Sequence, residues 1–120
     1  MIVVIITILT KTNLRRAKDV EIPKIITRNL VEIVTKDELI VLLRAKKRIR
    51  TYCGYETSGF VHIGTAATAL KQLDFIKAGW HVIVLLADLH TFLNSKGSRE
   101  WIDCMVDYWR EVFKALGLSI

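Results

Sequence analysis

The fold of this chain is constrained most by one stretch in which two strand patterns flank a helical pattern. TYCGYE (51–56) is predicted as a strand, and a helical pattern follows over about residues 62–78. Gly79 then suits the position that closes a helix. HVIVLLAD (81–88) is a nearly unbroken apolar run, typical of a strand covered on both faces. The order strand, helix, strand predicts a βαβ unit with parallel strands and a right-handed crossover.

Two helices are predicted before this unit. Apolar residues at nearly helical spacing occupy 25–33. TKDE (35–38) matches a capping box, in which Thr and Glu satisfy backbone groups at the start of a helix. Residues 11–24 show no clean period and include the only proline, so they are interpreted as a connector.

A basic run, RAKKRIR (44–50), follows the second of these helices. A phosphate-contact patch is one interpretation. A solvated helix end is favoured, because cations stabilise a helix C-terminus and no aromatic residue interleaves with these. The net charge of +6 and the pI of about 9.6 permit a polyanionic partner without establishing one.

A last helix is predicted after the polar turn NSKGS, with Ser98 as its N-cap. Gly117 ends this helix, and LSI (118–120) has the character of a third parallel strand at its beginning. The expected core stripe of the helix alternates spacings of three and four residues: Ile102, Met105, Trp109, Val112 and Leu116.

The composition suits one soluble globular domain, with 120 residues of which 52% are hydrophobic and 25% charged. Cys53 and Cys104 are expected to be small core residues, and no disulfide framework or metal site is predicted. The apolar run within residues 1–12 has about half the length of a bilayer span and lacks the preceding positive charge of a secretory signal. It is interpreted as a β-strand, and the protein is expected to be cytoplasmic, without membrane association.

Polar residues gather where both strands of the βαβ unit end, which is the ligand-binding edge of a parallel sheet. YETSGFVHIGT (55–65) is neither a dinucleotide fingerprint nor a P-loop. Its small residues allow a nucleotide to approach, and His62 at a helix N-terminus can donate a hydrogen bond to a phosphate. The residues expected to converge are Glu56, Thr57, Ser58 and His62 from the first loop and Asp88, His90 and Asn94 from the second.

These motifs resemble one family. HIGT, preceded by YETSG and followed by LLADLHTFLN (85–94), is similar to the archaeal and eukaryotic type of tyrosyl-tRNA synthetase, a class I enzyme whose first signature is His-Ile-Gly-His. The resemblance covers about Ile25 to Leu118. It implies an α/β fold class in which residues 25–120 are the N-terminal half of the catalytic domain. That half is the first part of a Rossmann-like parallel-sheet nucleotide-binding domain, preceded by helices. Residues 1–24 have no counterpart and form an extension of unknown role.

The resemblance also implies a reaction. Members of the family activate L-tyrosine with ATP, giving tyrosyl-adenylate and pyrophosphate, and then transfer the tyrosyl group to tRNA(Tyr). ATP is a substrate accompanied by Mg²⁺, no tightly bound cofactor is expected, and the complete enzyme is expected to be a homodimer. The family's lysine-rich signature loop and anticodon-binding domain have no counterpart in these 120 residues, so this chain alone is expected to have little activity.

Site residues are carried over by matching position. The implied ATP site comprises Gly54, Glu56, Ser58, His62, Gly64 and Thr65. The implied tyrosine site comprises Tyr52, Gly54, Glu56, Leu85, Ala87 and His90. His62 and Thr65 are the expected catalytic residues, and Tyr52 is directed at the phenolic hydroxyl of the substrate. Thr65 replaces the last histidine of the signature but keeps a hydroxyl donor. Thr57 replaces a proline that is usual in the family, which is expected to loosen the turn.

Other interpretations stay open beside this one. The chain fits a non-catalytic paralogue that binds a nucleotide or a partner, or a tryptophan-specific synthetase, although Tyr52 and LLADLHTFLN oppose the latter. Tyr52 also suits an ordinary strand aromatic, and His62 and His90 suit plain helix-start and turn-capping residues. Finally, the uncovered edge of strand 81–88 is expected to promote association, unless residues 1–12 pair onto it.

Overall fold

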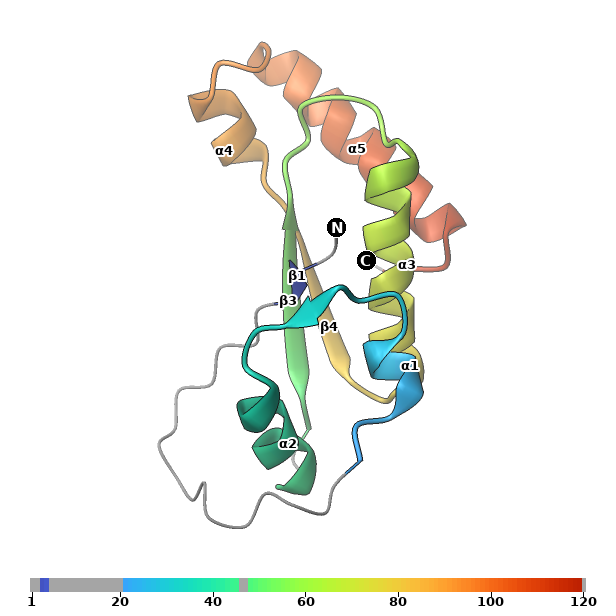
Figure 1. Ribbon diagram of the computed structural model, residues 1–120. Coiled ribbons are helices and arrows are strands. Elements are labelled where there is room, and N and C mark those ends of the chain that lie inside the picture. The colour runs from blue at the N-terminus through green and yellow to red at the C-terminus, as the bar shows by residue number, and fades with distance from the viewer. Residues whose placement is uncertain (1–2, 5–20, 46–47, 120) are drawn as a thin grey trace.

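The computed structural model describes residues 3–4, 21–45 and 48–119. Its elements are β1 (Val3–Val4), α1 (Lys24–Thr27), β2 (Glu32–Ile33), α2 (Lys36–Arg44), β3 (Arg50–Tyr55), α3 (Ile63–Lys77), β4 (His81–Leu86), α4 (Asp88–Leu93) and α5 (Arg99–Ala115). Within the described residues they form two parallel two-stranded sheets, β1–β2 and β3–β4 (Figure 1).

β3, α3 and β4 form the predicted βαβ unit. The two strands pair in parallel along their whole length, in a register that places Tyr55 opposite Leu86. The helix ends where predicted, because Gly79 has a φ of +82° and the N–H of Trp80 donates to the carbonyl of Phe75 at 3.0 Å. This left-handed position, which glycine adopts without strain, turns the chain from α3 directly into β4.

Helices α3 and α5 lie on the same side of the β3–β4 sheet and build the main core with it (Figure 1). As predicted, Ser98 is the N-cap of α5, and its hydroxyl accepts a hydrogen bond from the N–H of Trp101. The indole N–H of Trp109 donates to the carbonyl of Gly59 at 2.7 Å, which ties α5 to the loop after β3. The buried core residues are Tyr55, Ala69, Met105, Trp109, Phe113 and Leu118.

The predicted stripe of α5 is confirmed only in its first part. The buried residues of the helix are Ile102, Met105, Trp109 and Phe113. Phe113 replaces Val112 in the stripe, and Val112 and Leu116 are half-buried. Cys104 is exposed, so its prediction as a core residue is wrong, whereas Cys53 is half-buried and packs against the core.

The other face of the β3–β4 sheet is open in the part of the chain that the structure describes. Ile83 and Leu85 are 42% and 44% exposed, and Tyr52 is 64% exposed. The prediction that strand 81–88 is covered on both faces is therefore wrong here. A continuous apolar run shows that both faces can be buried, but not that this chain supplies the cover.

The predicted helix over residues 25–33 is wrong. Only Lys24–Thr27 is helical, Asn29 adopts a positive φ of 60°, and Glu32–Ile33 is a strand that pairs with β1. Ile26 and Ile33 nevertheless pack against the same second core. Their helix-like spacing thus comes from a turn followed by a strand.

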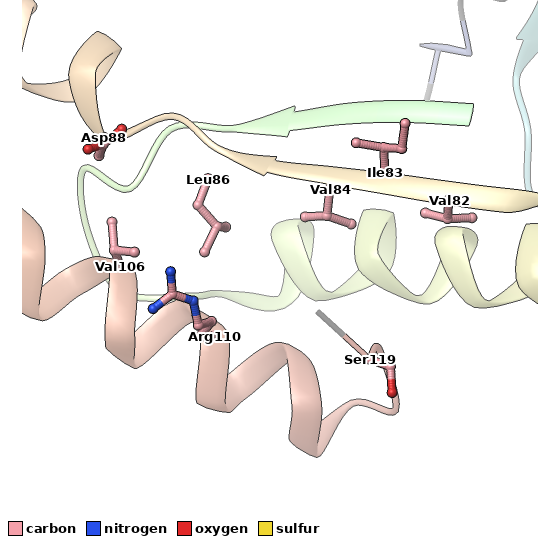
Figure 2. A pocket seen from close by; sticks show the side chains of 8 residues that line it. All are labelled: Val82, Ile83, Val84, Leu86, Asp88, Val106, Arg110 and Ser119. Atoms are coloured by element: carbon pink, nitrogen blue, oxygen red, sulfur yellow. The ribbon is translucent and has the colours of Figure 1, made fainter. Parts of the chain in front are cut away.

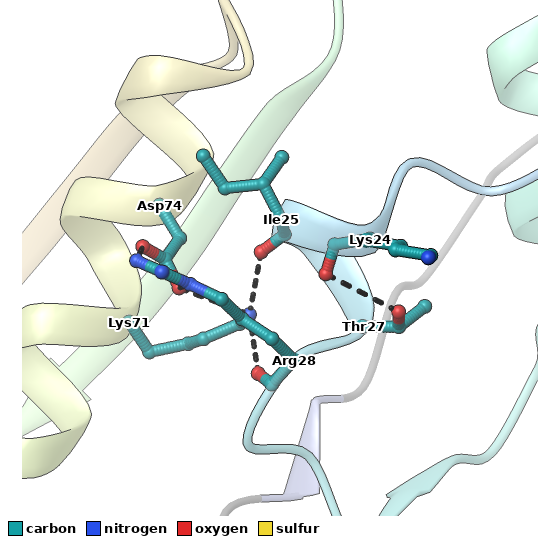
Figure 3. Close-up of polar contacts among 6 residues, drawn as sticks. All are labelled: Lys24, Ile25, Thr27, Arg28, Lys71 and Asp74. Atoms are coloured by element: carbon teal, nitrogen blue, oxygen red, sulfur yellow. Dashed lines mark hydrogen bonds and ion pairs between the residues drawn. The ribbon is translucent and has the colours of Figure 1, made fainter.

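An ion cluster around the buried residues Lys71 and Asp74 docks α1 against α3 (Figure 3). The Lys71 ammonium group donates to the carbonyls of Ile25 and Arg28 at 3.0 and 2.9 Å, and lies 3.4 Å from the carboxylate of Asp74. The Arg28 guanidinium donates two hydrogen bonds to the same carboxylate. These hydrogen bonds hold the pKa of Asp74 below its ordinary value, while burial lowers the pKa of Lys71.

Helix α2 begins at Lys36 as predicted, although the Thr35 side chain makes no capping hydrogen bond. The basic run agrees with a solvated helix end, since Arg44 ends α2 and Arg48 and Arg50 are exposed. Residues 46–47 of that run lie outside the described residues.

The two ends of the chain differ in outcome. Of residues 1–12 only Val3 and Val4 are described; they form a strand, as interpreted, but pair with β2 and not with the β3–β4 sheet. The described part of the connector, residues 21–24, is irregular up to the start of α1. Residues 118–119 form no strand, because Leu118 turns into the core instead; Ile120 lies outside the described residues. No helix in the described ranges is long and apolar enough to cross a bilayer.

Candidate functional site

The carboxyl ends of β3 and β4 meet at one edge, as predicted. Pairing continues one residue past the strands, where the N–H of Ala87 donates to the carbonyl of Tyr55 at 2.8 Å. Glu56 follows β3 directly, and Asp88 follows β4 after one residue, Ala87. The segment expected to be a loop after β4 is instead the helix α4, which stands at this edge together with the start of α5 (Figure 1).

Two buried threonines connect the loop after β3 to α4. The N–H of Thr57 donates to the hydroxyl oxygen of Thr91 at 3.1 Å, and the two hydroxyl oxygens are 3.3 Å apart. The expectation that Thr57 loosens this turn is wrong, because a proline would lack the N–H that makes the first of these bonds.

A polar network lies just outside these threonines. The side-chain amide of Asn94 donates to Glu56 Oε1 at 3.1 Å, and its nitrogen is 3.0 Å from Nε2 of His90. Because the same amide nitrogen faces both groups as a donor, Nε2 of His90 acts as the acceptor in this contact. Three of the predicted polar residues are thus brought together. Asp88, another of the predicted residues, pairs separately with Arg99 at 3.1 Å.

The predicted tyrosine-site residues on the strands share the open face of the sheet. A Cβ atom at Gly54 would lie 3.3 Å from the phenolic oxygen of Tyr52 and 4.0 Å from the side chain of Leu85. The Tyr52 ring therefore lies across Gly54, beside Leu85, with its hydroxyl directed along the face. Ala87 is half-buried at the end of β4, next to the edge that carries His90.

The predicted phosphate-binding residues gather at the start of α3. His62 is the N-cap, and its Nδ1 accepts a hydrogen bond from the N–H of Gly64 at 3.2 Å. Its Nε2 is 3.4 Å from the hydroxyl of Thr65. A Cβ at Gly64 would lie 3.1 Å from the imidazole ring, so only glycine gives the ring this position easily. The helix N-terminus, an imidazole and a hydroxyl together favour an anion.

The two groups are separate in the described residues, since no hydrogen bond joins the His62 group to the Glu56 network. Ser58 is exposed in the loop between them. Among the described residues, no group of three or more His, Cys, Asp or Glu side chains is placed to hold a metal ion. Thr91 is the functional candidate that sequence analysis missed, because nothing local distinguishes it from any helix threonine.

A cavity of about 530 Å³ lies elsewhere, between β4 and α5. In Figure 2, Val106 and Arg110 project from α5 towards Leu86, while Ile83 points away from Val82 and Val84. None of the residues implied for the tyrosine or ATP sites lines this cavity. It borders the outer edge of β4.

Comparison with known proteins decides the family. The family described as tRNA synthetases class I (W and Y) matches residues 44–107. The chain belongs to this family. It is 48% identical over 96 residues to the tyrosine–tRNA ligase of Archaeoglobus fulgidus, covering 80% of this chain and 30% of that protein, and the same figures hold for the tyrosine–tRNA ligase of Methanopyrus kandleri.

A solved structure agrees with the sequence matches. The tyrosyl-tRNA synthetase of Archaeoglobus fulgidus, crystallised with L-tyrosine, superposes with a TM-score of 0.75 and 48% identity over 79% of this chain and 30% of that one. The resemblance to tyrosyl-tRNA synthetases and the Rossmann-like fold class are thereby confirmed. The chain spans about 30% of the length of the curated relatives that it matches.

Proposed function

We propose that this chain is the N-terminal part of a tyrosine–tRNA ligase catalytic domain and forms one side of its tyrosine and ATP sites. The observation that carries the proposal is the open sheet face on which Tyr52, Gly54 and Leu85 lie together beside the Glu56 network. Its support from outside the chain is the 48% identity to a synthetase that was crystallised with L-tyrosine.

In the proposed tyrosine site the aromatic ring of the substrate lies on the apolar surface of Leu85 and Ala87, beside the Tyr52 ring that lies across Gly54. The Tyr52 phenol then donates to, or accepts from, the substrate hydroxyl. A site that pairs with a hydroxyl rejects an analogue that lacks it more strongly than an apolar pocket rejects an extra group. This arrangement therefore selects tyrosine over phenylalanine.

In the proposed ATP site the imidazole of His62 and the hydroxyl of Thr65 face the phosphates. A tyrosine carboxylate oxygen attacks the α-phosphorus, a new P–O bond forms, and the bond to the bridging oxygen breaks to release pyrophosphate. The ionised carboxylate needs no general base, so the chain contributes by positioning and by stabilising negative charge. ATP with Mg²⁺ is the proposed substrate, and tRNA(Tyr) is the proposed acceptor.

The complete protein is proposed to be a cytoplasmic homodimer that makes tyrosyl-tRNA. Since this chain spans about a third of its relatives, it supplies only part of the charge-stabilising groups. We expect pyrophosphate exchange by the 120-residue chain alone to be negligible. A non-catalytic module that binds tyrosine or a nucleotide is the second candidate, and it predicts binding with no exchange even when the rest of a synthetase is supplied.

Titration of the chain with L-tyrosine, L-phenylalanine and L-tryptophan, followed by NMR, tests the tyrosine site. We expect tyrosine to bind at least about tenfold more tightly than phenylalanine. Tyr52→Phe is expected to remove most of that preference, and Phe60→Leu, a matched aromatic substitution on an exposed residue outside the site, is expected to leave it unchanged. Stronger binding of tryptophan, or equal binding of tyrosine and phenylalanine, would exclude a tyrosine-specific site.

A further inference from the structure

The two threonines that join the loop after β3 to α4 are completely buried. Thr57 and Thr91 each have a relative exposure of 0%, although they are 34 positions apart in the sequence. Besides its contacts with Thr57, the Thr91 hydroxyl donates to the carbonyl of Ala87, one turn earlier, at 2.8 Å. This pair therefore links the loop after β3 to the first turn of α4 at the ligand edge.

The single hydroxyl proton of each threonine fixes the direction of these bonds. Thr91 uses its proton on the Ala87 carbonyl, so in the contact between the two hydroxyls Thr57 is the donor. Thr91 Oγ1 then accepts two hydrogen bonds, from the amide and from the hydroxyl of Thr57. Loss of the Thr91 oxygen would leave two donors buried without a partner.

The exposed Glu56 network is built on the immediate neighbours of this pair. Glu56 precedes Thr57, His90 precedes Thr91, and Asn94 follows Thr91 by three residues on the same helical turn. Hydrogen bonds among exposed side chains compete with water and hold geometry weakly, whereas buried ones do not face this competition. The buried hydrogen bonds of Thr57 and Thr91 are therefore the more rigid support for the placement of Asn94 against Glu56.

We propose that Thr57 and Thr91 are positioning residues: their buried hydrogen bonds fix the separation of the two loops and thereby hold Glu56, His90 and Asn94 in place at the ligand edge. For the identity of the ligand, this inference rests on the proposed tyrosine site. The positioning itself belongs to the chain without any ligand.

Amide hydrogen exchange and NMR on the ligand-free chain test the positioning. Thr91→Val keeps the shape and removes the acceptor, so the Thr57 amide is expected to exchange at least about tenfold faster. The side-chain amide resonances of Asn94 are expected to shift, although Asn94 itself is unchanged. Thr91→Ser keeps the oxygen and is expected to restore both signals.

Thr27→Val is the matched control, because the Thr27 hydroxyl also donates to a carbonyl of its own helix, that of Lys24, and lies outside the ligand edge. It is expected to change neither signal. If Thr91→Val does not fold, the Asn94 resonances are measured in Thr57→Val instead. That variant removes only the donor hydroxyl of residue 57 and keeps its backbone amide. Unchanged Asn94 resonances in the folded variant, or a serine variant that behaves like the valine variant, would overturn the proposal.

Titration with L-tyrosine separates the positioning from the proposed function. Thr91→Val is expected to weaken binding about tenfold and Thr91→Ser less than about twofold. If the wild-type chain binds no tyrosine, the proposed tyrosine site fails for this chain, while the exchange data still decide the positioning. If tyrosine binds the valine variant as tightly as wild type while the Asn94 resonances have shifted, the pair does not position residues for this ligand.

Discussion

His62 uses both ring nitrogens at the start of α3. Nδ1 accepts from the N–H of Gly64, so the ring proton of the neutral imidazole lies on Nε2, beside the Thr65 hydroxyl. One ring nitrogen thus stabilises the helix, and the other remains the donor available to a phosphate. These two roles can be separated by substitution.

His62→Ala is expected to lower the free energy of unfolding by about 1 kcal/mol, because the N–H of Gly64 at the start of α3 loses its side-chain acceptor. His62→Asn is expected to keep most of the stability, since asparagine is a good N-cap, but to lose the imidazole donor. Urea denaturation measures the first effect, and ATP titration followed by NMR measures the second.

His81→Ala provides the control, since His81 is an exposed histidine at the start of β4 and not at a helix terminus. It is expected to leave stability within about 0.5 kcal/mol of wild type. Equal loss of stability in the alanine and asparagine variants of His62 would show that the imidazole does not act as a cap.

At the scale of single residues, the sequence predicts the features that depend only on neighbouring residues. The capping position of His62 follows from the HIGT motif and from where the helix starts, within four residues. The role of Thr91 depends on Thr57, 34 positions away, and no local pattern indicates it. Cys104 is a different case, because it lies outside the predicted stripe of α5, and its expected burial followed from its residue type and not from the period.

Among the elements, the docking of α1 on α3 depends on an ion cluster. Asp74 is buried, and its partner Arg28 is half exposed. Because the pKa of Asp74 is held below its ordinary value of 3.8, its ionised form contributes stability above the unfolded value. That contribution is lost as the pH falls through the lower pKa of the folded state.

Asp74→Asn is therefore expected to lower the free energy of unfolding at pH 7 by about 1–2 kcal/mol, a range reduced for the exposure of Arg28. Urea denaturation between pH 7 and pH 3 should show the difference from wild type shrinking below about pH 4. Asp107→Asn, which removes an exposed partner of Arg110, is the control and is expected to have little effect at any pH. A difference that stays constant down to pH 3 would contradict the ionic origin.

The long elements were predictable because several turns or a full strand repeat the same pattern. α3 and α5 have 15 and 17 residues, and each is bounded by a capping residue and a glycine that the sequence displays. α4 has six residues and α1 four, which is too short for a period to emerge. β2 exists only through pairing with β1, a contact between segments nearly thirty residues apart.

At the scale of the whole molecule, the β3–β4 sheet is covered by helices on one face and open on the other. The open face carries Tyr52, Ile83 and Leu85, and the outer edge of β4 borders the cavity next to α5. β1, which was the candidate for covering this edge, pairs with β2. The described chain therefore leaves a paired strand with one free edge and an apolar face, a combination that favours association.

Ile83→Lys is expected to shift the chain towards monomer, because a charge on the open face of an edge strand opposes edge-to-edge and face-to-face contact. Sedimentation velocity at several protein concentrations measures the effect, and we expect the wild-type chain to show a concentration-dependent rise in mass that the variant lacks. Val31→Lys replaces another exposed apolar residue outside this sheet and is expected to keep the wild-type behaviour. A wild-type chain that stays monomeric at about 100 µM would show that the open face does not drive association. A dissociation constant above that concentration belongs to the weak end of specific protein interfaces.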